Sequence, residues 1–405
     1  MGHRTHPPSV VPGIPVLESC PPGWNCVRFH EVLERVERRA SLHPDESYQL
    51  LVAKRSRGGI VSREVLRGRQ ILTPSQFLVH AGDFLVSRRQ IVHGACGLVP
   101  PALHGAVVSN EYATFRAKTS VLLSFFNYFT HTRYFQQVCF QSSIGIDVEK
   151  MVLQLDRWLD SPMCIPSVEE QRQIVSLLDS SERLLATSQS LLQALTSRKA
   201  HILEELLRDV ATSEAGHGAV PLSSAVNLIT DRSVHNGPTL CVDLQHIVGG
   251  QGRLIHDRTS QVSSGDKLRF RRGDVLFGKL RPYLRKSWLA DQEGNCSGEI
   301  WVLRTNSIKL SPQFLSYFVQ SAAFISATNV VSGSKMPRAD WRLVSRLLVN
   351  LPAIKRQQEI VDLLTACDSE IELARERLGI QRELHGQLVV EATTGKCRYR
   401  GCHRD

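Results

Sequence analysis

The feature that most constrains this chain is a long amphipathic run from Pro166 to Leu207. Its leucines come in pairs seven residues apart, at Leu177/Leu178, Leu184/Leu185 and Leu191/Leu192. Heptad spacing with polar residues between is typical of a helix that packs one narrow apolar seam against another helix. At ~1.5 Å per residue, a continuous helix over residues 167–208 would be roughly 60 Å long, too long for an ordinary core helix. On this segment alone, a hairpin of two shorter helices broken near Thr187 and Ser188 is an equal alternative.

The same pattern occurs again 186 residues later, starting at Pro352. The residues Pro166, Gln171, Ile174, Val175, Leu177 and Leu178 recur as Pro352, Gln357, Ile360, Val361, Leu363 and Leu364. The second run has its own heptad seam at Leu364, Ile371 and Leu378. Two long helices that each leave an apolar stripe uncovered are natural partners, because helices of this kind gain most of their stability from packing.

The segments that precede the two runs are also related. Gly82-Asp83-Phe84-Leu85 matches Gly273-Asp274-Val275-Leu276, and Ser109-Asn110-Glu111-Tyr112 matches Ser297-Gly298-Glu299-Ile300. Tyr128-Phe129 and Phe135 match Tyr317-Phe318 and Phe324. Since the offset stays between 186 and 191 residues in separate patches, the chain is a tandem duplication of a globular module followed by a long helix.

Composition narrows the class of protein. A chain of 405 residues with 42% hydrophobic and 22% charged residues is expected to fold into two or three ordinary globular domains. No apolar run is long enough to cross a bilayer, and residues 1–19 lack the apolar core of a signal peptide, so we expect a cytoplasmic protein. The ten cysteines are scattered and never form Cys-x-x-Cys, which favours reduced thiols over disulfides or a zinc site.

The net charge of +10 suggests a polyanionic partner, and the basic residues gather in glycine-containing loops of both modules. Phosphates attract cations, and base edges pair with Arg, Lys, Asn or Gln side chains. For any single residue, a solvated surface loop is an equally good interpretation. The aromatic residues between Leu122 and Phe140 could stack on bases, but packing in the core of a helical segment is favoured. The candidate DNA-binding residues are Arg55, Arg57, Arg69, Arg88, Arg89, Lys279, Arg281, Tyr283, Arg285, Lys286, Lys335 and Arg338.

These features together resemble the specificity subunit of type I restriction–modification systems. The resemblance covers residues 21–400 and includes Pro22-Gly23-Trp24, the run Arg281-Pro282-Tyr283-Leu284-Arg285-Lys286 and the closing Thr394-Gly395-Lys396-Cys397-Arg398. It implies an α+β fold, in which two tandem globular target-recognition domains are separated by two long helices packed as an antiparallel coiled coil. The implied segments are a flexible extension (1–20), recognition domain 1 (21–165, the first module), long spacer helix 1 (166–210), a linker (211–219), recognition domain 2 (220–351, the second module), long spacer helix 2 (352–395) and a tail (396–405).

The resemblance also implies a function. The chain would bind double-stranded DNA, reading a bipartite target, and would direct adenine methylation and restriction by two methylation subunits and by restriction/translocase subunits. It would have no catalytic residues, no metal and no cofactor of its own. The residues expected at the helix pair or at a subunit interface are Glu170, Gln171, Ile174, Leu178, Leu185, Leu192, Gln357, Ile360, Leu364, Ile371 and Leu378.

Two other classes of function stay open. A stand-alone nuclease or methyltransferase is disfavoured, because the sequence lacks Gly-x-Gly-x-x-Gly, a phosphate-binding loop and the Asn/Asp-Pro-Pro-aromatic tetrapeptide. A coiled-coil scaffold without a DNA role is disfavoured by the basic loops. Three departures from the family pattern are notable. Arg356 replaces the acid found at Glu170, Gly379 and Gly386 fall inside the second helix, and the first module lacks the Arg-Pro-Tyr-Leu-Arg-Lys run.

Overall fold

The computed structural model describes residues 7–73, 75–212, 218–233, 240–255, 267–328 and 337–396. The chain forms two compact units, and each is described by itself. Unit 1 comprises Met1–Thr187 and Leu378–Asp405, and unit 2 comprises Ser188–Arg377. The first module lies in unit 1 and the second module in unit 2, while each long helix contributes to both units.

The first module alternates short strands with short helices. Its strands are β1 (Asn25–Arg28), β2 (Leu33–Val36), β3 (Ser47–Ala53), β4 (Ile60–Arg67), β5 (Gln76–Leu78), β6 (Phe84–Ser87), β7 (Cys96–Leu98), β8 (Val107–Ser109), β9 (Tyr112–Ala117), β10 (Ser143–Ile144), β11 (Val152–Leu153) and β12 (Pro162–Ile165). Its α-helices are α1 (Phe29–Val32), α2 (Leu123–Phe129), α3 (Arg133–Gln141) and α4 (Leu155–Leu159), and its 3-10 helices are η1 (Gly68–Gln70), η2 (Ile91–His93), η3 (Pro101–Leu103) and η4 (Val148–Lys150).

The second module repeats this order. Its strands are β13 (Ala211–Thr212), β14 (Val220–Pro221), β15 (Val226–Ile229), β16 (Arg232–Ser233), β17 (Cys241–Val242), β18 (Lys267–Phe270), β19 (Val275–Gly278), β20 (Ser287–Leu289), β21 (Gly294–Ser297), β22 (Ile300–Thr305) and β23 (Leu348–Val349). Its α-helices are α6 (Pro312–Phe318), α7 (Ala322–Thr328) and α8 (Trp341–Val344), and its 3-10 helices are η5 (Leu222–Ser224), η6 (Leu244–His246) and η7 (Pro282–Leu284).

Sheet topology shows the duplication directly. One sheet has the order β2-β9-β6-β7 in the first module and β15-β22-β19-β20 in the second, with every pairing antiparallel. In the second sheet, the order β3-β8-β5 of the first module corresponds to the order β17-β21-β18 of the second. Each copy contains one parallel pairing, β3 with β8 and β17 with β21. The copies differ at the added strand, because β4 pairs with β3 in the first module whereas β16 pairs with β18 in the second.

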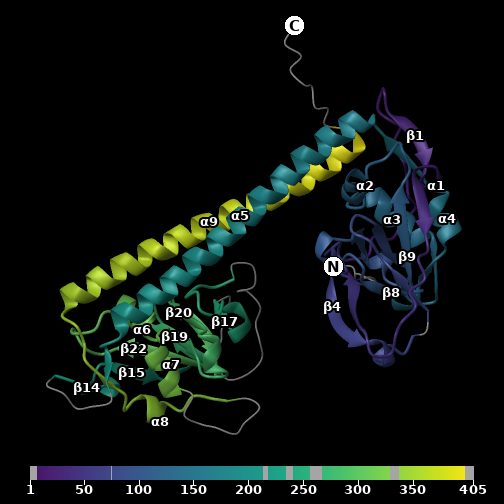
Figure 1. Cartoon of the computed structure of the whole chain (residues 1–405). Coiled ribbons are helices and arrows are strands. Elements are labelled where there is room, and N and C mark those ends of the chain that lie inside the picture. The colour runs from purple at the N-terminus through teal and green to yellow at the C-terminus, as the bar shows by residue number, and fades with distance from the viewer. Residues whose placement is uncertain are drawn as a thin grey trace. The chain divides into compact units, whose positions relative to one another are not determined.

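The two long runs are single helices, α5 (Val168–Leu207) and α9 (Ile354–Thr394), drawn as uninterrupted ribbons in Figure 1. The hairpin alternative near Thr187 is therefore wrong, and α9 continues through Gly379 and Gly386. Glu169 and Glu170 occupy the first turn of α5, where the positive end of the helix dipole favours acidic side chains.

The helices pack antiparallel within each unit. In unit 1, Ile174 and Leu178 share a core with Val389 and Ala392. In unit 2, Leu203 and Leu207 share a core with Ile360, Val361 and Leu364. Together with the duplicated modules, this arrangement confirms the α+β class with two globular modules and two long helices.

The aromatic residues of the first module form its core. Phe29, Phe126, Phe135 and Trp158 are fully buried and meet edge to face or tilted, which is the favoured geometry for aromatic pairs. The segment from Leu122 to Phe140 is helical as expected, with a break at residues 130–132 between α2 and α3. Core packing, and not base stacking, is the role of Phe125, Phe126, Phe129 and Phe135.

The expectation that the cysteines are reduced thiols is wrong for one pair. Cys20 and Cys164 form a disulfide, although 144 residues separate them in the sequence. The strand pairing β1–β12 and the segment before Trp24 bring the two Cα atoms to 5.4 Å, a proximity that sequence spacing does not show. No helix among the described residues is long and apolar enough to span a membrane.

Candidate nucleic-acid interface

The loop after β19 carries four basic side chains within residues 279–286. Its backbone is tied to the segment before α8, because Arg281 N donates to Pro337 O at 2.8 Å and Ala339 N donates to Lys279 O at 2.8 Å. The Arg281 and Tyr283 side chains are exposed. The Arg281 guanidinium forms no hydrogen bond or ion pair within the described residues. Among the described residues, this loop therefore presents an unpaired, exposed cation and, two residues further on, an exposed aromatic ring, groups that suit contacts with phosphates and bases.

Three other basic candidates of the second module, Arg285, Lys286 and Arg338, have partners, while the Lys279 side chain is half-buried. Arg338 makes a two-pronged contact with Glu299, at 3.1 and 3.2 Å. Lys286 Nζ donates to Leu244 O at 2.6 Å, and burial lowers the pKa of its ammonium group. Arg285 donates to Glu204 and to the Gln320 carbonyl. Lys335 lies outside the described residues.

In the first module the exposed candidates are paired with carboxylates of the same module. Arg55 binds Glu149 through two nitrogens at 2.5 and 3.2 Å. Arg89 Nε donates to Glu111 at 2.5 Å, and Arg69 donates to Asp45 at 3.2 Å. Such exposed pairs contribute ~1 kcal/mol or less, so a phosphate can displace the carboxylate at small cost.

Arg57 and Arg88 are half-buried. The Nη1 atom of Arg57 and the Nε atom of Arg88 are enclosed without a hydrogen-bond partner among the described residues. Burial lowers the pKa of the Arg57 guanidinium, which packs on Gly94. The side chains of these two arginines are therefore more enclosed by the module than residues of an exposed basic loop would be.

The basic residues that follow β6 in the first module and β19 in the second occupy equivalent positions. Arg88 N donates to Glu111 O after β6, and Lys279 N donates to Glu299 O after β19. The loop of the second module contains η7, and the first module has η2 at the corresponding place. A backbone counterpart of the Arg-Pro-Tyr-Leu-Arg-Lys run therefore exists in the first module, although its cations do not.

The motif glutamines Gln171 and Gln357 are completely buried and bind backbone groups of their own modules. The Gln171 side chain accepts from Leu122 N at 2.8 Å and donates to the carbonyls of Ser120 and Pro166. The Gln357 side chain accepts from Ser311 N at 3.0 Å and donates to the carbonyls of Lys309 and Pro352. Each glutamine thus joins the start of a long helix to the loop before α2 or α6.

The remaining predicted interface residues lie along the helices. Glu170 accepts a hydrogen bond from Trp24 Nε1 at 3.1 Å, within unit 1. The fully buried apolar positions are Ile174, Leu178, Ile360, Leu364, Ile371 and Leu378. Leu185 and Leu192 are half-buried. The heptad pattern therefore identifies the seam well near the modules and less well in the middle of α5.

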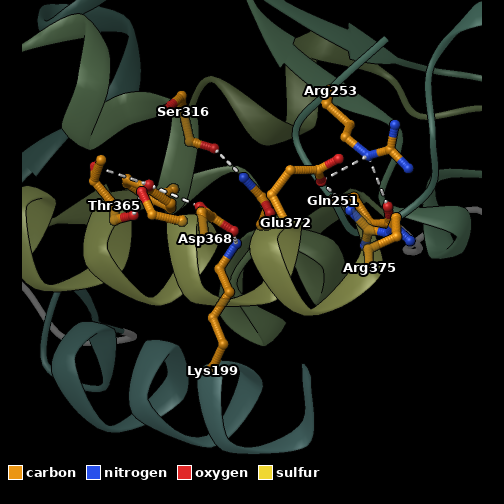
Figure 2. Close-up of polar contacts among 11 residues, drawn as sticks. Lys199, Gln251, Arg253, Ser316, Thr365, Asp368, Glu372 and Arg375 are labelled. Carbon is orange, nitrogen blue, oxygen red and sulfur yellow. Dashed lines mark hydrogen bonds and ion pairs between the residues drawn. The ribbon is translucent and has the colours of Figure 1, made fainter. Parts of the chain in front are cut away.

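A polar contact between the helices crosses the seam in unit 2. Lys199 of α5 reaches Asp368 of α9, which also accepts from the Tyr317 hydroxyl at 2.9 Å (Figure 2). Burial raises the pKa of Tyr317, so its hydroxyl stays a donor. Sequence reasoning missed these residues, because only the packed helices bring them together.

A cavity of about 520 Å³ lies beside this contact, between the helices and the glycine-containing loop 249–253. Arg253 of this loop approaches Glu372 of α9 at 3.9 Å and donates to Gln251 at 3.0 Å (Figure 2). Arg285 and Gln320 also line it. Within the described ranges, no three His, Cys, Asp or Glu side chains are placed to hold a metal ion.

Comparison with known proteins is consistent with this geometry. Residues 262–381 match the family model of the type I restriction modification DNA specificity domain. The type I restriction enzyme EcoDI specificity subunit of Escherichia coli is 29% identical over 130 residues, which are 32% of this chain and 28% of that protein. The HindI specificity subunit of Haemophilus influenzae is 26% identical over 130 residues, covering 30% of this chain and 28% of that protein.

The fold likeness extends further than the sequence likeness. A chain solved in a study of complex assembly and conformational transition of the type I R-M system matches with a TM-score of 0.64 and 17% identity, over 94% of this chain and 100% of that chain. The HsdS subunit from Thermoanaerobacter tengcongensis matches with a TM-score of 0.51 and 17% identity, over 94% and 99%. The resemblance seen in the sequence is thus confirmed: this chain is related to the specificity subunits of type I restriction–modification systems, in sequence over residues 262–381 and in fold over nearly its whole length.

Proposed function

We propose that this chain is the non-catalytic specificity subunit of a type I restriction–modification complex in the cytoplasm. Each module contacts one half of a bipartite double-stranded DNA target. Methylation subunits, two in the complete complex, modify adenines in that target, and restriction/translocase subunits join the assembly. The observation that carries the proposal is the duplicated α+β module with basic residues after the same strand in both copies, in a chain whose second module matches the specificity-domain model.

The basic residues have two roles in this proposal. The exposed cations after β6 and β19 hold phosphates, which gives affinity for any sequence and a dependence on salt concentration. A few side chains, among them the exposed Arg281 and Tyr283 of the second module, reach base edges. The helices α5 and α9 fix the separation of the half-sites. Since one heptad is ~10 Å of helix, inserting a heptad in both is expected to change that separation by roughly three base pairs of ~3.4 Å each, if the coil follows the DNA.

The decisive experiment is to co-express the chain with its methylation subunit and to map the methylated adenines. A split, asymmetric motif is the expected result. Methylation without sequence preference, or activity of the isolated chain, would point to a stand-alone enzyme. Absence of salt-sensitive DNA binding by the assembled complex would point to a scaffold.

Substitution of Arg281 sharpens the assignment within the second module. Arg281→Ala is expected either to weaken binding to all sequences with a smaller salt dependence, or to relax preference at one position by ~1–3 kcal/mol. Binding constants measured at several salt concentrations on matched and scrambled targets separate the two roles. An unchanged affinity together with an unchanged preference would remove Arg281 from the interface.

A further inference from the structure

Glu204, on the face of α5 that meets the second module, binds two separate parts of that module. Both of its carboxylate oxygens accept from Ala322 N, at 3.0 Å each, where α7 begins. One of them also accepts from Arg285 Nη1 at 3.3 Å. Arg285 donates in addition to the carbonyl of Gln320 at 3.0 Å. A single helix carboxylate therefore connects α5 to the basic loop after β19 and to the turn between α6 and α7.

The loop held by this contact has an unusual backbone. Arg281 and Arg285 bracket η7, and both have positive φ angles, 52° and 49°. Residues with a Cβ rarely adopt this left-handed conformation, and they persist there when surrounding contacts hold them. The far end of the loop is held by the Glu204 contact and by Gly250 N, which donates to Arg285 O at 2.9 Å. The Arg281 and Tyr283 side chains, at the near end, face solvent.

The first module lacks both members of the pair. Gly94, with φ of 77°, occupies the place of Arg285 after η2. Val390 occupies the place of Glu204, 186 residues later in the repeat. The shared fold therefore forms without this contact, so the contact is an addition particular to the second module and its loop.

We propose that Glu204 is a positioning residue for DNA recognition by the second module. Through Arg285 it holds the loop 281–284 in the conformation that directs Arg281 and Tyr283 outward, so a residue of the spacer helix sets the preference at the half-site that this module contacts. This inference rests on the proposed function. Arg285 then acts on DNA through the loop, and not as a direct contact.

The test uses the assembled methylation complex with wild-type chain, Glu204→Gln, Arg285→Gly and the double variant. Glu205→Gln is the matched control, because Glu205 is the next residue of α5, is exposed, and pairs with Arg208 of the same helix. Glycine at 285 is the residue of the first module at this position and suits the left-handed backbone. The readout is methylation of target variants with single base changes in each half-site, together with binding to scrambled DNA across salt concentrations.

We expect Glu204→Gln and Arg285→Gly each to lower discrimination at one or two base pairs of the second half-site by at least about fivefold. The double variant should lose no more than either single variant, since both act through one contact. Preference in the first half-site, binding to scrambled DNA and its salt dependence should stay as in the wild type, as should all properties of Glu205→Gln.

Two outcomes would overturn the inference. One is an unchanged second half-site preference in Glu204→Gln. The other is an equal loss of binding to all sequences, which would show a merely structural contact. If the wild-type complex itself shows no bipartite preference, the proposed function fails first, so the two failures are distinguishable.

Discussion

The two modules share the same framework of sheets and differ in the partners of their charged side chains. Asp83 and Asp274 occupy the same buried turn before β6 and β19, and each accepts from arginine. In the first module Arg38 supplies the two-pronged contact, whereas in the second Arg304 does. The buried carboxylate thus pairs with arginine in both modules. The two-pronged contact comes from a different arginine in each, although Arg116, the counterpart of Arg304, still reaches Asp83 at 3.5 Å.

The larger difference lies next to the proposed DNA-binding loops. The second module has Arg285 and Gln320 where the first has Gly94 and His131. In the first module Arg57 packs on Gly94 and has an enclosed nitrogen without an acceptor among the described residues. In the second module the cation at this place is thus tied to α5 through Glu204, whereas in the first module a glycine stands there and Arg57 packs against it.

The largest effect is expected at the buried aspartates. Asp274→Asn removes the charge that binds Arg304 at 2.7 Å, and breaking such a buried pair costs ~3–5 kcal/mol. Asp83→Asn should destabilise the first module in the same way. Urea unfolding measures the loss of stability, and hydrogen exchange of β19 and β6 shows which module has lost it. The exposed Asp291→Asn variant is the control. If either variant raised hydrogen exchange equally in both modules, the two modules would not be stabilised independently of each other.

The next effect is expected at the motif glutamines. Gln357→Leu leaves Ser311 N and two carbonyls without their partner, at a cost of ~2–3 kcal/mol. Gln171→Leu should do the same for unit 1 alone. Hydrogen exchange of α2 and α6 localises the loss, and the exposed neighbours Gln173→Ala and Gln358→Ala are the controls. A loss spread over both units would show that the modules are coupled more tightly than the repeat implies.

The stability of unit 1 should depend on pH through His131. Burial, with the charge of Arg57, lowers the pKa of His131 to about 4. The unfolded chain, with a histidine pKa of ~6.5, takes up a proton between pH 6.5 and 4 that the folded chain does not, so stability falls there by about 1 kcal/mol per pH unit. Above pH 6.5 this histidine contributes nothing to the pH dependence.

His131→Gln installs the residue found at Gln320 and should flatten this part of the pH dependence for unit 1. Urea unfolding of the wild type and the variant at pH 7 and pH 5 measures it. If both lose the same stability on going to pH 5, His131 is not the group responsible.

The smallest effect is expected from freeing the paired cations. Glu111→Gln releases Arg89, and Glu299→Gln releases Arg338. Because exposed pairs contribute ~0.2–1 kcal/mol, the DNA affinity of the complex should rise by about 1.4-fold to fivefold, with a steeper salt dependence. Glu293→Gln makes the same charge change at the exposed pair with Arg269 and should have less effect. An equal rise in all three would show a general charge effect.

Much of the fold was predictable because it is repeated and periodic. The heptads at Leu178 and Leu364 predict the helix pair, and the duplicated patches predict the tandem modules. Gly379 and Gly386 depart from the family pattern, but α9 continues through them because helix propagation is cooperative and Leu378 and Val389 on the same helix are buried. The disulfide was not predictable from spacing.

The candidate site was predictable only in part. The basic composition of the loop 279–286 is visible in the sequence, but the partners of its cations are not. Local sequence carries no signal for the contact of Glu204 with Arg285, 81 residues away, or for that of Arg55 with Glu149, 94 residues away. A charged residue is equally a DNA contact or half of an ion pair until its neighbours are known.

By itself, therefore, the sequence determined the class of fold, the duplication and the long helical seam, because these depend on periodicity and recurrence along the chain. The tertiary structure alone decided that Arg285 is held by Glu204 while Arg281 has no partner in the described part of the chain, and that Gln171 and Gln357 bind the loops of their own modules. The physical reason is that these outcomes depend on contacts between distant segments, which packing brings together and which no local pattern encodes.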